Sequence, residues 1–254
     1  MRKGEMVMRV MVCVLALLVG WSEITAVRAE GPRKELAIVI DDFGNDMGGT
    51  DAMLELPVPL TVAVMPFMPT TAEDAERAYY LGHEVIVHMP MEPMKGKRSW
   101  LGPGAITTDL SDEEIRKRVH DAIHAVPHAV GMNHHMGSKA TASERVMRIV
   151  LEECKNHGLY YLDSKTTGSS VIPELATELG VPYLENEIFL DHVYSIEHMK
   201  KQAKRVEKEL VEEEDLIAIG HVGIAGEKMV SVLSEFIPIF KSKADIVPLS
   251  DLLP

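Results

Sequence analysis

The sequence contains 254 residues, of which 46% are hydrophobic and 26% charged, and it carries a formal net charge of −13 at pH 7. This composition is typical of a globular protein, and the excess of acidic residues argues against nucleic acids and anionic lipid surfaces as partners. Neutral and cationic ligands remain compatible with this charge, sugars and amino sugars among them.

The start of the chain has the features of a secretory signal peptide. A basic beginning precedes the unbroken apolar run 10–20, and the small-residue sequence Ala26-Val27-Arg28-Ala29 follows. The run is shorter than the roughly 20 residues that cross a bilayer, so we expect cleavage after Ala29 and a secreted or periplasmic protein without a stable membrane span. An uncleaved membrane anchor is the alternative, because no charge follows the apolar run until Glu23.

Residues 30–254 are expected to form one domain, because they show no internal repeat, low-complexity tract or long linker. Short apolar runs predict strands at 35–41, 60–65, 84–88, 128–132, 159–162, 181–184, 216–220 and 245–248. Helical patterns lie between them, at 47–55, 71–81, 112–125, 142–157, 172–179, 196–213 and 227–241. This alternation predicts an α/β fold, a complete or incomplete (β/α) barrel of seven to eight parallel strands.

Several of these apolar runs stop on ionisable side chains. The runs end at Asp41-Asp42, His88, Asn133-His134-His135, Asp163 and His221. The C-terminal ends of parallel strands share one rim, so these side chains should gather at a single site. This pattern predicts an enzyme.

The Asp41-Asp42 pair allows a division of labour, in which one carboxylate binds a cation and the other takes a proton from water. A solvated turn is the alternative, because Asp-Asp-Phe-Gly is also typical of loops. His88 is a better ligand candidate than His83, which we place at a turn between helix and strand. Glu92 follows His88 by four residues and could share the pocket.

Only one imidazole of His134 and His135 is expected to enter the site, the other serving as a supporting or substrate contact or lying at the surface. Imidazole and carboxylate ligands suit Zn²⁺ or another borderline divalent metal. His221 is placed to act as a general acid. A separate set, His120, His124 and His128, has a spacing that can bind a metal on a helix, but an exposed helix face without a ligand is the simpler interpretation.

Six short motifs follow one another in a fixed order. They are Ile40-Asp41-Asp42-Phe43-Gly44, Gly82-His83-Glu84-Val85 with His88, Gly131-Met132-Asn133-His134-His135-Met136-Gly137-Ser138, Leu162-Asp163-Ser164-Lys165-Thr166-Thr167, Phe189-Leu190-Asp191 and Ile217-Ala218-Ile219-Gly220-His221. In this order the chain resembles the divergent polysaccharide deacetylase family over residues 35–253. The resemblance implies a secreted, distorted (β/α) barrel related to metal-dependent carbohydrate N-deacetylases.

The resemblance also implies residue roles. Asp41 matches the family's catalytic base and Asp42 the neighbouring metal ligand, while His88 matches the first metal-binding histidine and His221 the general acid. Related deacetylases carry a second histidine where this chain has Glu92, and an arginine motif where it has residues 133–138. We infer that His135, or else His134, supplies the missing imidazole.

The expected function is that of a secreted hydrolase that uses a divalent metal, Zn²⁺ in the first instance, to remove N-acetyl groups from cell-envelope polysaccharide or peptidoglycan. The residues expected to bind substrate or support the ligands are Glu92, Asn133, His134, Asp163, Ser164 and Asp191. Two alternatives remain open: an inactive barrel that binds envelope glycan or protein, and a hydrolase for esters or non-sugar amides.

Overall fold

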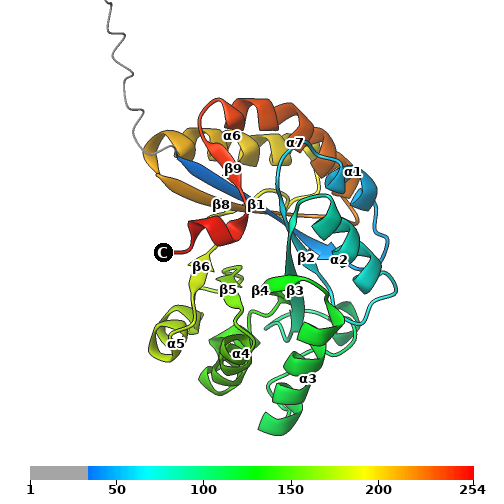
Figure 1. The fold of residues 1–254 in the computed structure, drawn as a ribbon, viewed down its shortest axis with the longest axis vertical. Coiled ribbons are helices and arrows are strands. Elements are labelled where there is room, and N and C mark those ends of the chain that lie inside the picture. Colours follow the sequence, from blue (N-terminus) through cyan, green and yellow to red (C-terminus); the bar gives the residue numbers. More distant parts are fainter. Residues whose placement is uncertain (1–33) are drawn as a thin grey trace, which may run out of the picture. The chain divides into compact units, whose positions relative to one another are not determined.

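A curved sheet of parallel strands lies at the centre of the fold (Figure 1). The computed structural model describes residues 34–254. In that part the strands follow the order β6-β5-β4-β3-β2-β1-β8-β7, with β9 paired to β1 beside this path. Their bounds are β1 Glu35–Phe43, β2 Thr61–Val64, β3 Glu84–Met91, β4 Ala129–Met136, β5 Tyr160–Asp163, β6 Tyr183–Glu185, β7 Ile188–Phe189, β8 Asp215–His221 and β9 Asp245–Val247.

Only two residues, Asn186 and Glu187, connect the strands at the two ends of the sheet, β6 and β7. The backbone N–H of Asn186 donates to the carbonyl of Asp163 (2.9 Å), and that of Glu187 donates to the carbonyl of Ile217 (3.3 Å). Within the described range no pairing joins β6 to β7 directly. The expected distorted (β/α) barrel is therefore confirmed. The predicted alternation of strands and helices is wrong at this point, because β7 follows β6 with no helix between them.

Helices surround the sheet on the outside (Figure 1). Their bounds are α1 Thr50–Leu54, α2 Thr71–Tyr80, α3 Asp112–Ala125, α4 Glu144–Asn156, α5 Ile172–Leu179, α6 Ile196–Glu212 and α7 Gly226–Lys241. Short 3₁₀ turns cover Arg98–Trp100, Ala140–Ala142 and Leu249–Leu252. The hydroxyl of Ser111 caps α3 by accepting from the backbone N–H of Glu114 (3.2 Å). No helix of residues 34–254 is long and apolar enough to cross a membrane, and the expected signal peptide, residues 1–29, lies outside the described residues.

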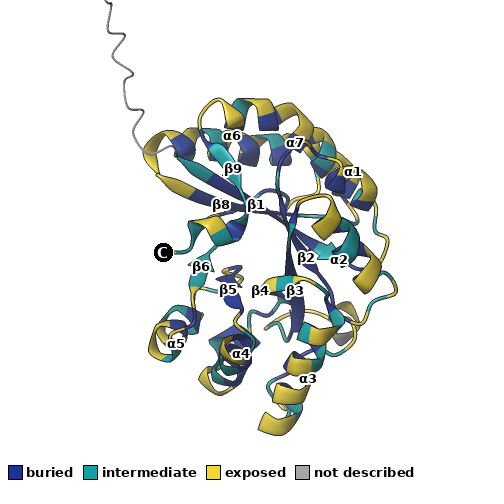
Figure 2. Ribbon diagram, in the orientation of Figure 1, coloured by how far each residue is buried: buried dark blue, intermediate teal, exposed yellow. Residues whose placement is uncertain are grey.

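Both faces of the sheet are buried, as the dark strands of Figure 2 show. On β1, Leu36, Ile38 and Ile40 pack in the cluster that includes the helices, whereas Ala37 and Val39 pack in a smaller cluster built mainly from strands. Side chains alternate between the two faces of a strand. The smaller cluster is therefore the interior of the barrel, and the next position on that interior face is Asp41.

The C-terminal segment covers the end of the barrel at which the strands begin. Leu249 belongs to the interior cluster, and its backbone N–H donates to the hydroxyl of Thr61 (2.9 Å). The backbone N–H of Ser250 donates to the carboxylate of Glu84 (3.2 Å). Glu84 also accepts from the hydroxyl of Tyr160 (2.7 Å). These contacts cover the end of the barrel at which the strands begin.

Two strands run further than the sequence pattern predicts. The register pairs His88 with Asn133, Pro90 with His135 and Met91 with Met136, so β3 and β4 continue past the predicted ends at 88 and 132. The polar residues of β4 therefore lie within a strand rather than in the loop after it. The apolar pattern could not show this, because hydrogen bonding between the two backbones continues past the polar residues at which the apolar runs stop.

A bulge interrupts β1 at the Asp41-Asp42 pair. Ile40 is opposite Val62 and Phe43 is opposite Val64, so β1 contains one more residue than β2 over this stretch. Asp42 has a φ of 72°, which lies in the left-handed region. A non-glycine residue there costs about 1 kcal/mol, although aspartate is among the residues that tolerate it best. The bulge turns Asp42 out of the regular alternation of the strand.

Candidate metal and active site

Three ligand atoms from three strands converge at the open end of the barrel. Oδ1 of Asp42 lies 2.9 Å from Nδ1 of His135 and 3.2 Å from Nε2 of His88. All three atoms lie within 4.8 Å of one another. Atoms that share one Zn²⁺ in a tetrahedral shell are about 3.3 Å apart, so small side-chain rotations would complete the set. Asp42, His88 and His135 are the residues the sequence proposed as metal ligands.

The hydrogen bonds around these imidazoles fix which nitrogen of each ring faces Asp42. Nε2 of His135 lies 3.2 Å from the carbonyl oxygen of Trp100, and Nδ1 of His88 lies 2.7 Å from Oδ1 of Asn133. Each of these oxygens only accepts, so each of these nitrogens donates. In the neutral rings, Nδ1 of His135 and Nε2 of His88 then present lone pairs to the carboxylate of Asp42. Lone pairs at these distances are stable only with a proton or a cation between them.

The buried Nε2 of His88 is the clearest sign that a metal fits here. His88 is 1% exposed, and its Nε2 has no hydrogen-bond partner within the described residues, because the approach to Asp42 has the distance of an ion pair but not the angles of a hydrogen bond. A buried nitrogen without a partner is costly. Burial raises the pKa of Asp42, but the close contacts with His135 and His88 and the positive charge of their protonated rings hold it well below its usual value. Asp42 is therefore ionised, as a ligand must be.

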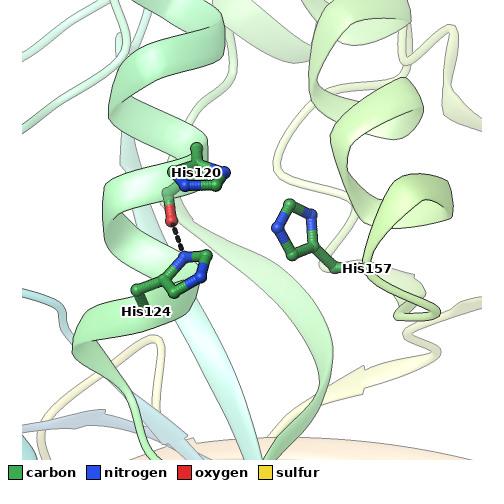
Figure 3. Close-up of side chains that lie close together, drawn as sticks. All are labelled: His120, His124 and His157. Atoms are coloured by element: carbon green, nitrogen blue, oxygen red, sulfur yellow. Dashed lines mark hydrogen bonds between the residues drawn. The ribbon is translucent and has the colours of Figure 1, made fainter.

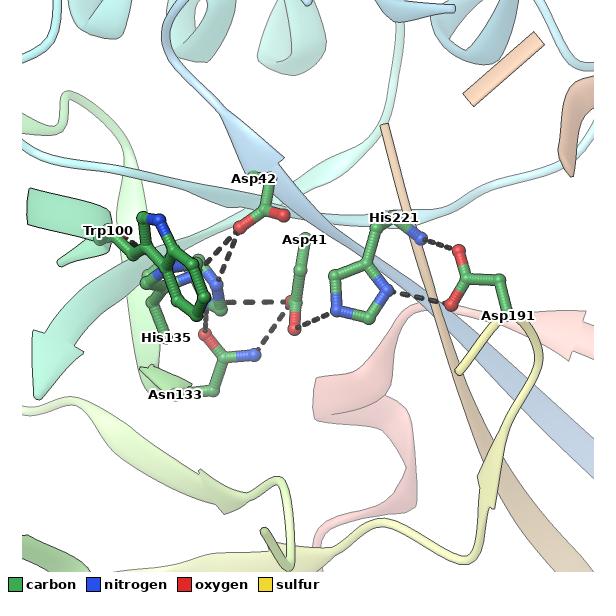
Figure 4. Close-up of polar contacts among 8 residues, drawn as sticks. Asp41, Asp42, Trp100, Asn133, His135, Asp191 and His221 are labelled. Carbon is green, nitrogen blue, oxygen red and sulfur yellow. Dashed lines mark hydrogen bonds and ion pairs between the residues drawn. The ribbon is translucent and has the colours of Figure 1, made fainter. Parts of the chain in front are cut away.

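Asp41 lies beside this set on the interior face of β1 and is held by Asn133 (Figure 4). The amide of Asn133 donates to Oδ1 of Asp41 (2.8 Å) while its carbonyl accepts from His88. Burial raises the pKa of Asp41, the neighbouring His88 and His221 lower it, and the carboxylate of Asp42 raises it again, with a net rise. A carboxylate with a raised pKa is a better general base than a free aspartate.

His221 faces Asp41 from the end of β8 and is oriented by Asp191 (Figure 4). Nδ1 of His221 donates to one carboxylate oxygen of Asp191 (2.8 Å), and the backbone N–H of His221 donates to the other (2.8 Å). Burial lowers the pKa of His221, but the bond to Asp191 and the charges of Asp191, Asp41 and Asp42 raise it to about 10. The ring is therefore an imidazolium at neutral pH and can donate the proton on Nε2.

His134 points to the opposite face of β4 from Asn133 and His135. Its Nδ1 lies 3.2 Å from the hydroxyl of Tyr161, and its Nε2 lies 3.4 Å from the hydroxyl of Thr166. Burial, with the charges of His88 and His135, lowers the pKa of His134 to about 3, so the ring is neutral. His134 is among the residues that line the cavity, but it is absent from the converging ligand set, because it lies on the other face of the strand from His135.

The remaining predicted residues divide into those near the cavity and one that lies elsewhere. Ser164 and Asp191 line the cavity, whereas Asp163 is buried behind it, where Oδ1 accepts from the backbone N–H of Lys165 (2.8 Å). The expectation that Glu92 shares the pocket is wrong. Its carboxylate accepts from the backbone and hydroxyl of Thr108 (2.8 and 2.7 Å) and from Lys139 (2.8 Å), and it is not among the lining residues.

A cavity of about 600 Å³ contains the converging groups and opens to the surface. Its polar floor includes Asp41, Asp42, His88 and His221. Its rim carries large exposed side chains, which are Trp100, Tyr194 and Ile224. The sequence pattern did not identify Trp100, because it lies in the irregular segment after β3, and only its backbone carbonyl contacts a proposed ligand.

Residues 38–253 match the sequence model of the family described as divergent polysaccharide deacetylase. The chain belongs to this family. The uncharacterised protein YibQ of Escherichia coli K12 is 35% identical to it over 187 residues, which cover 74% of this chain and 58% of that protein. The chain thus spans about three fifths of the length of this relative. The sequence-based family assignment is confirmed.

Solved structures of low sequence identity share the fold. An uncharacterised protein of Agrobacterium tumefaciens C58 superimposes with a TM-score of 0.81 at 18% identity, over 87% of this chain and 90% of its own. A chitin deacetylase of Colletotrichum lindemuthianum gives a TM-score of 0.53 at 15% identity, over 86% and 87%. A CE4 family pseudoenzyme of Bacillus anthracis gives 0.50 at 12% identity, over 87% and 66%. The deacetylase-like barrel therefore occurs in both enzymes and pseudoenzymes.

Proposed function

We propose that this protein is a metal-dependent hydrolase that removes N-acetyl groups from a cell-envelope polysaccharide or peptidoglycan. The observation that carries the proposal is the placement of Asp42, His88 and His135 around one point, beside a carboxylate with a raised pKa, Asp41, which in turn contacts a protonated histidine, His221. Amide hydrolysis needs these three functions in one place. Membership of the family supports a deacetylase, and the signal-peptide pattern of residues 1–29 supports secretion to the periplasm or beyond.

A divalent ion held by Asp42, His88 and His135, Zn²⁺ in the first instance, would polarise the amide carbonyl and acidify a water molecule. Asp41 takes a proton from the attacking water, and Asn133 keeps its carboxylate in position through the 2.8 Å bond. The C–N bond then breaks as His221 gives the proton on Nε2 to the departing amine. Asp191 holds the ring of His221 in the orientation that this transfer needs.

The rim of the cavity supports a sugar as substrate. Trp100 and Tyr194 expose more than half of their surface (57% and 56%) beside the polar floor, and Phe189 also lines the cavity. Aromatic side chains offer flat apolar surfaces and few charges, which suits the C–H face of a neutral sugar ring. The acidic chain also favours a neutral or amino sugar over an anionic one.

The test is release of acetate from N-acetylglucosamine oligomers and from peptidoglycan by metal-loaded protein. Asp41→Asn should lower kcat by about 100-fold or more while metal content stays unchanged, because the base is lost and the ligand set is not. Wild-type protein with a full metal complement that releases no acetate from any of these glycans would contradict the proposal. Acetate release from simple esters or peptides alone would support a different substrate class.

The alternative is a catalytically inactive barrel that binds an envelope glycan or an envelope protein, and the fold shared with a pseudoenzyme is the observation in its favour. In that case glycan binding, measured by calorimetry, would persist in the wild-type protein without turnover. Asp41→Asn would then change neither measurement. Acetate release and glycan binding, measured on the wild type and on Asp41→Asn, therefore distinguish the two functions.

A further inference from the structure

Three histidines lie close together away from the active site (Figure 3). His120 and His124 are on α3, and His157 directly follows α4. Their potential ligand nitrogens lie within 4.8 Å of one another. The ring centroids of His120 and His124 are 4.2 Å apart, and that of His157 lies 5.2 and 5.5 Å from theirs. The sequence spacing suggested His120 and His124 together with His128, but His128 lies beyond the end of α3, and the packing of α4 against α3 brings His157 to the first two instead.

Two of the rings are held in the tautomer that leaves Nε2 free to bind a metal. Nδ1 of His124 lies 2.8 Å from the carbonyl oxygen of His120, and Nδ1 of His157 lies 2.9 Å from the carbonyl oxygen of Glu153. A carbonyl oxygen only accepts, so both Nδ1 atoms carry protons and the Nε2 atoms of the neutral rings carry free lone pairs. Metal-binding histidines commonly donate the other ring N–H to a backbone carbonyl in this way, which fixes the orientation of the ring.

The surrounding charges favour a cation. α3 ends at Ala125 and α4 at Asn156, so the negative ends of two helix dipoles lie beside the cluster. A carboxylate oxygen of Glu153 lies 4.0 Å from Nδ1 of His157. The nearby cation Arg116 is already engaged, with nitrogens 3.4 Å from Glu152 and 3.5 Å from Glu153.

We propose that His120, His124 and His157 form a second divalent metal site. Three imidazoles without an oxygen-rich shell suit Zn²⁺, Cu²⁺ or Ni²⁺ and are poor ligands for Ca²⁺ or Mg²⁺. The nitrogens need to approach to about 3.3 Å of one another, as in a tetrahedral shell with water in the fourth position. His120 is exposed and is not one of the two rings held by a backbone carbonyl, so its rotation can bring the nitrogens together.

The site connects two neighbouring helices and is separate from catalysis. α3 and α4 run back from the end of the barrel that holds the active site, so their C-terminal ends lie towards the opposite end. A metal bound here would join the C-terminal ends of α3 and α4. It would stabilise the fold by mass action without changing the catalytic groups.

The first experiment counts metal ions by Zn²⁺ titration and elemental analysis. Wild-type protein should bind about two ions per chain, and the double variant His120→Gln/His124→Gln about one. The matched control is His128→Asn, an exposed histidine outside the cluster whose left-handed backbone (φ 63°) asparagine tolerates. The control should bind as the wild type does. Equal stoichiometry in wild type and double variant would overturn the proposal.

A second measurement is independent of the active-site metal and of turnover. Long-range ¹⁵N–¹H spectra of the imidazoles should show that Zn²⁺ shifts Nε2 of His124 and His157 while the Nδ1 protons remain. These shifts should also appear in His88→Gln, which removes a proposed ligand of the other site. Coordination through Nδ1, or unchanged spectra of all three rings at saturating Zn²⁺, would overturn the assignment. Loss of acetate release alone would bear on the proposed function and not on this site.

Discussion

Nε2 of His221 lies 3.9 Å from Oδ2 of Asp41, so the proposed general acid and general base face each other across the cavity. Each group alters the proton affinity of the other, because the imidazolium lowers the pKa of Asp41 and the carboxylate raises that of His221. The two residues come from β8 and β1, which are neighbours in the sheet, and the register pairs them directly. A single parallel pairing therefore brings residues 41 and 221 together.

Replacement of Asp191 should move the alkaline limb of the activity profile. Asp191 supports the rise of the His221 pKa to about 10, so the proposed activity should have its alkaline limb near that value in the wild-type protein. In Asp191→Asn the limb should shift towards about 6.5, the ordinary value for histidine. The pH dependence of kcat/KM measures this shift. The exposed Asp251→Asn is the control and should keep the wild-type alkaline limb. An alkaline limb of Asp191→Asn that is also unchanged would count against the role of Asp191.

The raised pKa of His221 also predicts how the stability of the fold changes with pH. The pKa of His221 is higher in the folded state than its ordinary value, so its contribution is complete below about pH 6.5. That contribution is lost as the pH rises through about 10. Urea unfolding at several pH values should show Asp191→Asn less stable than wild type near neutrality, with the difference narrowing at high pH.

Removal of the Asn133 side chain should weaken metal binding and stability together. Asn133→Ala leaves Nδ1 of His88 and Oδ1 of Asp41 buried without this partner, at a cost of about 1–3 kcal/mol each. Loss of a group that orients a metal-binding histidine typically lowers affinity by about 10- to 100-fold. Competition with a chelator measures the affinity, and the exposed Asn45→Ala serves as control. Wild-type affinity in Asn133→Ala would show that His88 needs no such support.

The left-handed backbone of Asp42 predicts an unusual order of stability. Asp42→Gly relieves the strain at φ 72°, whereas Asp42→Ala retains it, so the glycine variant should be more stable by about 1 kcal/mol. Both should lose the active-site metal, since both lack the carboxylate. Unfolding in urea with chelator present isolates the backbone effect. An alanine variant at least as stable as the glycine variant would mean that the bulge relaxes when the side chain is removed.

Close packing inside the barrel makes Gly131 intolerant of a larger residue. A Cβ atom at this position would lie 2.4 Å from the ring of Tyr160, whose hydroxyl is tied to Glu84. Gly131→Ala should therefore destabilise the fold by about 1–3 kcal/mol. Gly168→Ala is the control, because nothing lies within 4 Å of the added atom. Equal melting temperatures would show that β4 and β5 can separate locally at no cost.

Much of the fold and the main site followed from the order of apolar runs and polar residues. Asp42, His88 and His135 could be proposed because parallel strands bring their ends to one rim. The role of Glu92 could not be judged in the same way, since its contacts with Thr108 and Lys139 depend on the path of an irregular segment. The cluster with His157 was equally hidden, because it arises from the packing of two helices.

The short link through Asn186 and Glu187 limits how far the barrel can open. β6 ends at Glu185 and β7 begins at Ile188, three residues later. Even when this link is fully extended, the end of β6 and the start of β7 can be no more than about 11 Å apart. Within the described residues β6 and β7 are not paired with each other, but the link between them bonds to Asp163 of β5 and Ile217 of β8 and so tethers the two sides of the seam. The link therefore limits how far β6 and β7 can move apart.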